Sequence, residues 1–216
     1  MPRTKQPERH PDHAGIYQTA GKDPRLEPVL RLAEICRYQS EHSHHVTHLA
    51  LLIFDAMQPL HRLDNEARFW LETAAILHDI GWIEGWHSHH KTTLRIILST
   101  PILPFNGKER LMIGSIARYH CKALPKATHD HYAALHPKEQ EVVTTLASFL
   151  RLADGLDCTH RGLIKDLDCE LTPDELVLLC KVHSAAHDDR LAAMEKADLF
   201  EKVYNRKVII RWVIIA

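Results

Sequence analysis

The sequence has 216 residues, of which 45% are hydrophobic and 25% are charged, and its formal net charge is −1. These values are typical of a single globular domain, and they disfavour a general nucleic-acid or membrane-surface binder, which would be more basic. The apolar runs are too short to cross a bilayer, the N-terminus lacks the apolar core of a signal peptide and the five cysteines are never spaced C-x-x-C, so we expect a cytoplasmic protein with reduced thiols.

Residues 1–24 are rich in proline and charge and poor in large apolar side chains, which predicts a flexible N-terminal arm. Helical periodicity then continues to about residue 163. It predicts about six helices, around Val29–Cys36 and over His42–Met57, Asp64–Gly81, His89–Leu98, Lys108–His120 and Lys138–Leu156. The segment 121–137 is expected to be a long loop.

The pattern changes after residue 163. Leu167–Leu171 and Leu176–Val182 are predicted strands on either side of a turn, Asp188–Tyr204 is expected to be helical, and Val208–Ile215 is rich in β-branched residues and predicts a last strand. The expected fold is therefore mainly α, with a helical domain and a small antiparallel β element at the C-terminus.

Two parts of one domain are expected after the arm. Residues 25–163 form the helical domain, and residues 164–216 form an α+β subregion packed on it. The apolar last strand would be an exposed edge on a monomer, so a homodimer is a natural expectation.

The sequence contains 18 histidines, and imidazole is the commonest metal ligand in proteins. His42 opens the second predicted helix, the dyad His78-Asp79 ends the third, and Asp154 lies late in a long apolar helix. Neighbouring residues on a helix point about 100° apart, so the dyad can converge on one ion only near a helix end, which Gly81 provides. Two histidines and two aspartates suit Mn²⁺, Fe²⁺, Mg²⁺ or Zn²⁺. The alternative is that each is a surface group, a helix cap or a satisfied core residue, but a buried carboxylate needs a partner or a metal.

This ordered pattern resembles the HD-domain metal-dependent phosphohydrolases. It is most similar to the HD domain found C-terminally in the exopolyphosphatase and guanosine-pentaphosphate phosphatase family. The resemblance covers roughly residues 28–216 and rests on residues 77–81, 89–91, 116–120, 122–126, 150–157 and 196–201. It implies an HD-type helical bundle. The family's N-terminal phosphatase half carries glycine-rich phosphate loops that the eight glycines here do not form, so we expect a free-standing HD domain.

The resemblance also implies two further histidine ligands in proteins that bind two ions. His89 is the candidate for the first because it stands four residues before the small Thr93; His90 is its close rival and His87 a weaker one. The candidate for the second is His120. Thr92 stands where the family usually has a histidine. The implied ligands of two divalent ions (Mn, Fe, Mg or Zn) are thus His42, His78, Asp79, His89, His120 and Asp154; the alternative for His89 and His120 is a surface position near a pocket.

Cationic side chains follow the same segments and would neutralise a bound phosphate: Lys91, Arg118, Lys122, Lys126 and Arg161. Arg118 and Lys122 are the strongest candidates for a catalytic role because they are nearest to His120 in sequence. The resemblance implies that Asp79 bridges the ions or orients the water. For any single cation, a solvated surface position is an equally good interpretation.

Two functions remain open. The first is a metal-dependent phosphohydrolase in which a metal-activated water attacks a phosphate ester, a nucleotide or a polyphosphate-like anion. The alternative is a non-catalytic regulatory module that binds polyphosphate or nucleotide. All four signature positions hold the required residue types, which favours the enzyme. Neither function involves a membrane or a specific nucleic acid.

Overall fold

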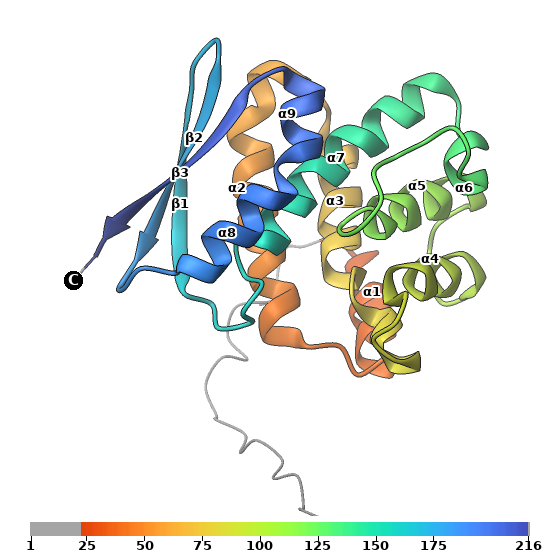
Figure 1. Cartoon of the computed structure of the whole chain (residues 1–216). Coiled ribbons are helices and arrows are strands. Elements are labelled where there is room, and N and C mark those ends of the chain that lie inside the picture. Colours follow the sequence, from red (N-terminus) through yellow and green to blue (C-terminus); the bar gives the residue numbers. More distant parts are fainter. Residues whose placement is uncertain (1–22, 216) are drawn as a thin grey trace, which may run out of the picture.

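The computed structural model describes residues 23–215, so the expected flexible arm lies outside the described residues except for Asp23 and Pro24. A helical part precedes a small sheet, and two helices separate the last two strands (Figure 1). The elements are α1 (Leu26–Ile35), α2 (Ser40–His61), α3 (Asn65–Leu77), the 3₁₀ helix η1 (Ile80–Glu84), α4 (His89–Ser99), α5 (Gly107–Arg118), α6 (Asp130–Ala133), α7 (Pro137–Gly155), β1 (Ile164–Leu171), β2 (Glu175–Val182), α8 (His187–Lys196), α9 (Asp198–Tyr204) and β3 (Lys207–Ile214). Among residues 23–215, no helix is long and apolar enough to cross a membrane.

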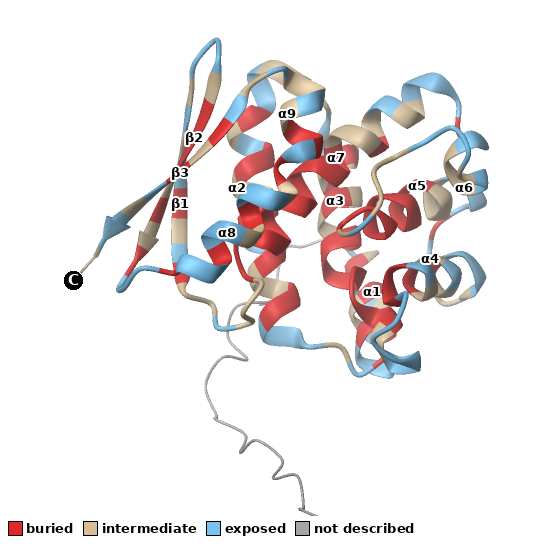
Figure 2. Ribbon diagram, viewed as in Figure 1, coloured by how far each residue is buried: buried red, intermediate tan, exposed pale blue. Residues whose placement is uncertain are grey.

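Helices α2 and α7 pack together at the centre of the helical part. Helices α3 and α5 also pack on α7, while β1 packs on α2 and so joins the sheet to the helices. The buried apolar side chains of the helices and of the sheet form one continuous core. Figure 2 shows this buried surface on the facing sides of the central helices. The last ten residues of α7, 146–155, are all buried, which places Asp154 in the core.

The ends of the helices follow from the sequence. The predicted N-cap Asp64 is confirmed, because its carboxylate accepts a hydrogen bond of 3.0 Å from the Ala67 N–H. Asn106 and Glu109 form a capping box that starts α5. Helix α3 ends at Leu77, so the His78-Asp79 dyad lies at a helix end as its spacing required.

The predicted strands are confirmed, but the expected antiparallel arrangement is wrong for the third one. The strand order is β1-β2-β3; β1 and β2 form an antiparallel hairpin, whereas β3 runs parallel to β2. The physical reason is the connection. Helices α8 and α9 return the chain to the end of the sheet where β2 begins, and such a crossover permits parallel pairing. Strand β3 lies at an edge of the sheet.

Candidate functional site

Six side chains predicted from the sequence as metal ligands meet inside the helical part. They come from the start of α2, the two residues that follow α3, the start of α4, the second residue after α5 and the end of α7. None is more than 9% exposed. We call this group the six-residue cluster: His42, His78, Asp79, His89, His120 and Asp154.

One half of the cluster brings together His42, His78 and Asp154. The Nε2 atoms of the two histidines are 3.2 Å apart. Asp154 Oδ1 lies 3.5 Å from the Nε2 of His42 and 3.7 Å from that of His78. These three donor atoms are close enough together to hold one ion.

The other half consists of His89 and His120, whose Nε2 atoms are 3.1 Å apart. Asp79 lies between the halves. Its Oδ1 is 3.3 Å from His89 and 3.4 Å from His120, whereas its Oδ2 is 3.5 Å from His78 and 3.9 Å from His42. Asp79 Oδ1 is buried and has no hydrogen-bond partner among the described residues. The two oxygens of one carboxylate thus face two separate donor sets.

Each of the four imidazoles of the cluster is fixed in its orientation by a contact of its Nδ1 atom, the ring nitrogen that faces away from the cluster. The Nδ1 atoms of His42, His78, His89 and His120 lie 2.8, 2.7, 3.1 and 2.6 Å from oxygens of Asp157, Ala75, Trp86 and Ala117, respectively. An oxygen acceptor at this distance keeps the proton of a neutral imidazole on Nδ1, so in the neutral ring each Nε2 presents its lone pair to the cluster. This arrangement is typical of histidines that bind a metal.

Helix α4 is tied directly to the dyad. The Gly81 N–H donates to Thr93 Oγ1 over 3.0 Å, and the same hydroxyl donates to the His78 carbonyl over 2.9 Å. At Gly81, a Cβ would lie only 2.0 Å from the His89 carbonyl oxygen. This close backbone approach brings His89 next to Asp79.

Two charged residues, partly buried Lys196 and buried Asp157, support the cluster from outside and were not assigned a role from the sequence. Lys196 on α8 forms an ion pair with Asp154 Oδ2, and Asp157 holds His42. Asp157 is 1% exposed and its other oxygen accepts from the Gly162 N–H over 2.8 Å. In the sequence, only the spacing Asp154-x-x-Asp157 at the end of a helix could have indicated a role for Asp157.

Burial and the neighbouring carboxylates set the protonation of the cluster. Burial lowers the pKa of His42, but Asp154 and Asp157 outweigh it and raise the pKa to about 9. Burial likewise opposes protonation of His89, yet Asp79 and Cys121 raise its pKa to about 10. Fully buried His78 has a pKa lowered to about 4 by desolvation. A divalent ion therefore has to displace protons from His42 and His89.

A pocket of about 270 Å³ opens beside Asp79. Its other lining residues are Cys36, Arg37, Tyr38, Gln39, Trp82 and Ile83. His160 stacks on the His42 ring at 3.7 Å, and its Nδ1 is 2.5 Å from Gln39 Oε1. His160 was not predicted from the sequence, because its position depends on a left-handed backbone conformation (φ 54°) in the loop after α7.

The predicted phosphate-binding residues differ in their surroundings. Arg118, at the end of α5, is 6% exposed, and its Nη1 is buried without a hydrogen-bond partner in the described part of the chain. Burial together with Arg118 lowers the pKa of His90 to about 3 and that of His131 to about 4, so both imidazoles are neutral beside the guanidinium. The other four cations, Lys91, Lys122, Lys126 and Arg161, are exposed.

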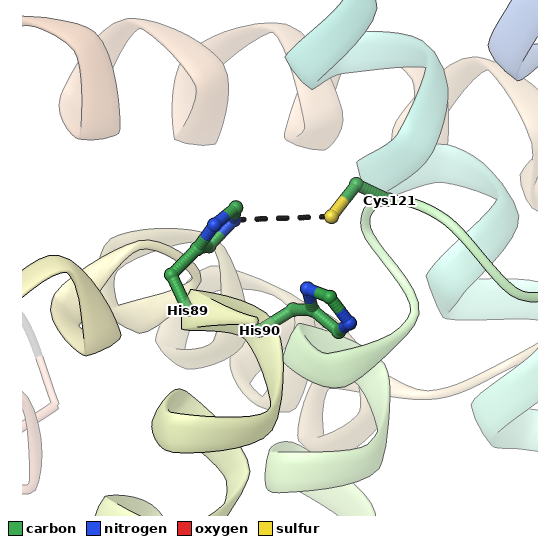
Figure 3. A group of neighbouring side chains, drawn as sticks. All are labelled: His89, His90 and Cys121. Atoms are coloured by element: carbon green, nitrogen blue, oxygen red, sulfur yellow. Dashed lines mark hydrogen bonds between the residues drawn. The ribbon is translucent and has the colours of Figure 1, made fainter. Parts of the chain in front are cut away.

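Cys121, which was not predicted as a ligand, directly follows His120. Its sulfur lies 3.8 Å from His89 Nε2 (Figure 3). Burial raises the pKa of Cys121, but His120 and His89 outweigh it and lower the pKa to about 6. Cys121, His89 and His90 form a further group whose donor atoms lie within 4.8 Å of one another.

Comparison with known proteins gives one clear match. A family model described as Ppx/GppA phosphatase, domain III, matches residues 25–202, which is most of the chain and includes every member of the six-residue cluster. No curated protein matches the sequence.

Proposed function

The chain belongs to the Ppx/GppA phosphatase domain III family, and from this premise we propose that it is a metal-dependent phosphohydrolase of the HD type. The six-residue cluster holds two divalent ions. His42, His78 and Asp154 bind one, His89 and His120 bind the other, and Asp79 bridges them. The substrate is a small phosphorylated anion: a phosphate ester, a nucleotide or a polyphosphate-like chain.

One observation carries this proposal: the two contacts between imidazole Nε2 atoms, at 3.2 Å and 3.1 Å. Each of these nitrogens belongs to a ring whose Nδ1 already faces an oxygen acceptor, so in the neutral rings two lone pairs point at each other. Such a contact is repulsive unless a cation lies beside it, either a proton or a metal ion. Asp79 Oδ1, next to His89 and His120, is buried without a hydrogen-bond partner among the described residues, so it too needs a cation beside it.

The donor set fits divalent ions of borderline to hard character. Imidazole suits Zn²⁺, Fe²⁺ and Mn²⁺, and carboxylates suit Mn²⁺ and Mg²⁺. When bound, a pair of such ions polarises a phosphoryl oxygen and lowers the pKa of a water molecule. The protein supplies the bridge through Asp79, and it fixes Asp154 through the ion pair with Lys196.

Arg118 is the residue that best fits the substrate phosphate. Its guanidinium is nearly buried, and it has a free donor, Nη1, that needs an acceptor. A phosphoryl oxygen would provide that acceptor in a charge-assisted hydrogen bond. Exposed Lys91 and Lys126 add positive charge at longer range. Their charge is felt at His129, whose pKa is lowered first by desolvation and then by Arg118, Lys126 and Lys91. Lys122 and Arg161 remain candidates on the loops that follow α5 and α7.

The test is hydrolysis of nucleotides, phosphate esters and polyphosphate by protein loaded with Mn²⁺, Fe²⁺, Mg²⁺ or Zn²⁺. We expect turnover by the wild type, loss of turnover in Asp79→Asn, and a fall of at least about 10²-fold in Arg118→Gln with the ion content unchanged. Arg68→Gln removes a partly exposed ion pair with Asp55 and is the control, with normal turnover. Absence of turnover from all the metal-loaded forms would contradict the enzyme. Tight binding of polyphosphate or nucleotide without turnover would instead favour a regulatory module.

A further inference from the structure

A second group of three potential metal ligands lies at the edge of the six-residue cluster. It shares His89 with the cluster and adds two residues outside it, His90 and Cys121. His89 and His90 come from the first turn of α4, and Cys121 comes from the loop after α5. Figure 3 shows the three side chains reaching toward one another, and one donor atom of each lies within 4.8 Å of the other two. Cys121 Sγ is 3.8 Å from His89 Nε2.

His90 supplies a second, independent indication of a ligand. Its side chain is 6% exposed, and its Nδ1 is buried without a hydrogen-bond partner among residues 23–215. A buried imidazole nitrogen without a partner is costly, and a cation bound beside it removes that cost. Because the Cys121 thiol and the His89 imidazole have donor atoms within 4.8 Å of one on His90, the requirement points to a metal ion.

We propose that His89, His90 and Cys121 form a third metal position, which takes a thiophilic divalent ion such as Zn²⁺. The donors are two imidazoles and one thiolate, a set that zinc prefers and that Mg²⁺ does not. Bond lengths of about 2.0–2.1 Å to nitrogen and about 2.3 Å to sulfur place neighbouring donors of a zinc tetrahedron about 3.6 Å apart. The observed separation of 3.8 Å between Sγ and Nε2 is close to that value. The ion binds the Cys121 thiolate and the neutral His89 and His90 rings, so any proton on the sulfur or on a coordinating nitrogen is released to solvent.

This third position competes with the six-residue cluster for one atom, and this consequence rests on the proposed function. His89 Nε2 faces Asp79 and His120 on one side and Cys121 on the other. A neutral imidazole nitrogen has a single lone pair, so it can bind only one of the two ions at a time. Hard ions leave His89 with Asp79, whereas thiophilic ions draw it toward Cys121. Excess Zn²⁺ or Cd²⁺ therefore inhibits by removing a ligand from the second ion.

Titration of the full chain with Cd²⁺ tests the third position directly, because a thiolate bound to Cd²⁺ gives a charge-transfer absorption in the ultraviolet. We expect this band in the wild type and its loss in Cys121→Ser. His90→Gln should weaken Cd²⁺ binding about tenfold or more. Cys169→Ser is the control, since this half-buried thiol lies on β1, and it should keep the band.

Two further measurements separate this inference from the proposed function. Asp154→Asn alters the six-residue cluster but none of the three ligands, so it should keep the Cd²⁺ band, and Cys121→Ser should keep its full Mn²⁺ content. A band that survives Cys121→Ser, or that never forms in wild type that still binds Mn²⁺, would overturn the third position and leave the proposed function intact. A band in a protein that binds no Mn²⁺ would support the third position and contradict the dinuclear cluster.

Discussion

Replacement of Gly81 by alanine should separate the two halves of the six-residue cluster. The added Cβ would lie 2.0 Å from the His89 carbonyl oxygen and 2.7 Å from the Thr93 nitrogen, both of which are backbone atoms that cannot rotate away. A carbon and a carbonyl oxygen approach no closer than about 3.3 Å. The first turn of α4 must therefore move by about 1.3 Å, several times the tolerance of about 0.2 Å for a metal–ligand distance.

The size of the effect on stability follows from the same contact. Overpacking of this kind costs about 1–3 kcal/mol. For a chain of this length, each kcal/mol lowers Tm by about 2–4 °C, so we expect a decrease of about 2–12 °C. The protein should also lose the ion held through His89, while His42, His78 and Asp154 keep theirs.

Thermal unfolding followed by circular dichroism, together with the Mn²⁺ content per chain, measures both effects. Gly107→Ala is the matched control, because nothing lies within 4 Å of a Cβ at that position. It should leave Tm and Mn²⁺ content unchanged. A Gly81→Ala protein with the wild-type Tm and the full complement of ions would refute the reasoning.

Three other predictions follow from the described contacts. Lys196→Met should lower the affinity for the first ion about 10–100-fold, as measured by competition with a chelating dye, because Asp154 loses the ion pair that orients it; unchanged affinity would show that Lys196 does not position this carboxylate. Metal binding should release protons near pH 7.5 and weaken as the pH falls, because the raised pKa values of His42 (about 9) and His89 (about 10) mean that both rings are protonated until the ion displaces the protons. Calorimetry in two buffers of different ionisation enthalpy measures that release, and heats that do not depend on the buffer would argue against it. The edge strand β3 leaves Val213 38% exposed, so a homodimer formed along this edge should become monomeric in Val213→Lys, whereas a monomeric wild type in light scattering would exclude the dimer.

Much of the fold was accessible from the sequence because local signals and packing agree. The apolar periodicity predicted the long helices, and the turn between β1 and β2 was clear from Thr172-Pro173. The direction of β3 was not predictable in this way, because it depends on how α8 and α9 pack rather than on the strand's own residues. The division of the chain at residue 163 remains a prediction.

The part of the site that could be predicted is the part that shows in the sequence as helix spacing or as a polar residue in an apolar helix. His78 and Asp79 could be placed at a helix end, and Asp154 stood out as a carboxylate in an apolar helix. His89 and His90 could not be separated by sequence alone; the contact of Gly81 with α4 decides that His89 faces Asp79.

Tertiary contacts determine the remaining parts of the site. Lys196 reaches Asp154 from a helix 42 residues away in sequence. His160 stacks on His42 only because the loop after α7 turns back across the start of α2. Residues of this kind carry no periodic signal, so the structure was needed to find them.

The content of divalent metal per chain tests the central claim most directly. The wild type and Asp79→Asn would be stripped with a chelator, reloaded with Mn²⁺, freed of excess ion and analysed for metal, with circular dichroism to verify that both are folded. The proposed dinuclear cluster predicts about two ions per wild-type chain and a loss of at least one in Asp79→Asn, whose amide cannot bridge. A folded wild type that retains no ion, or an Asp79→Asn protein that retains both, would contradict it.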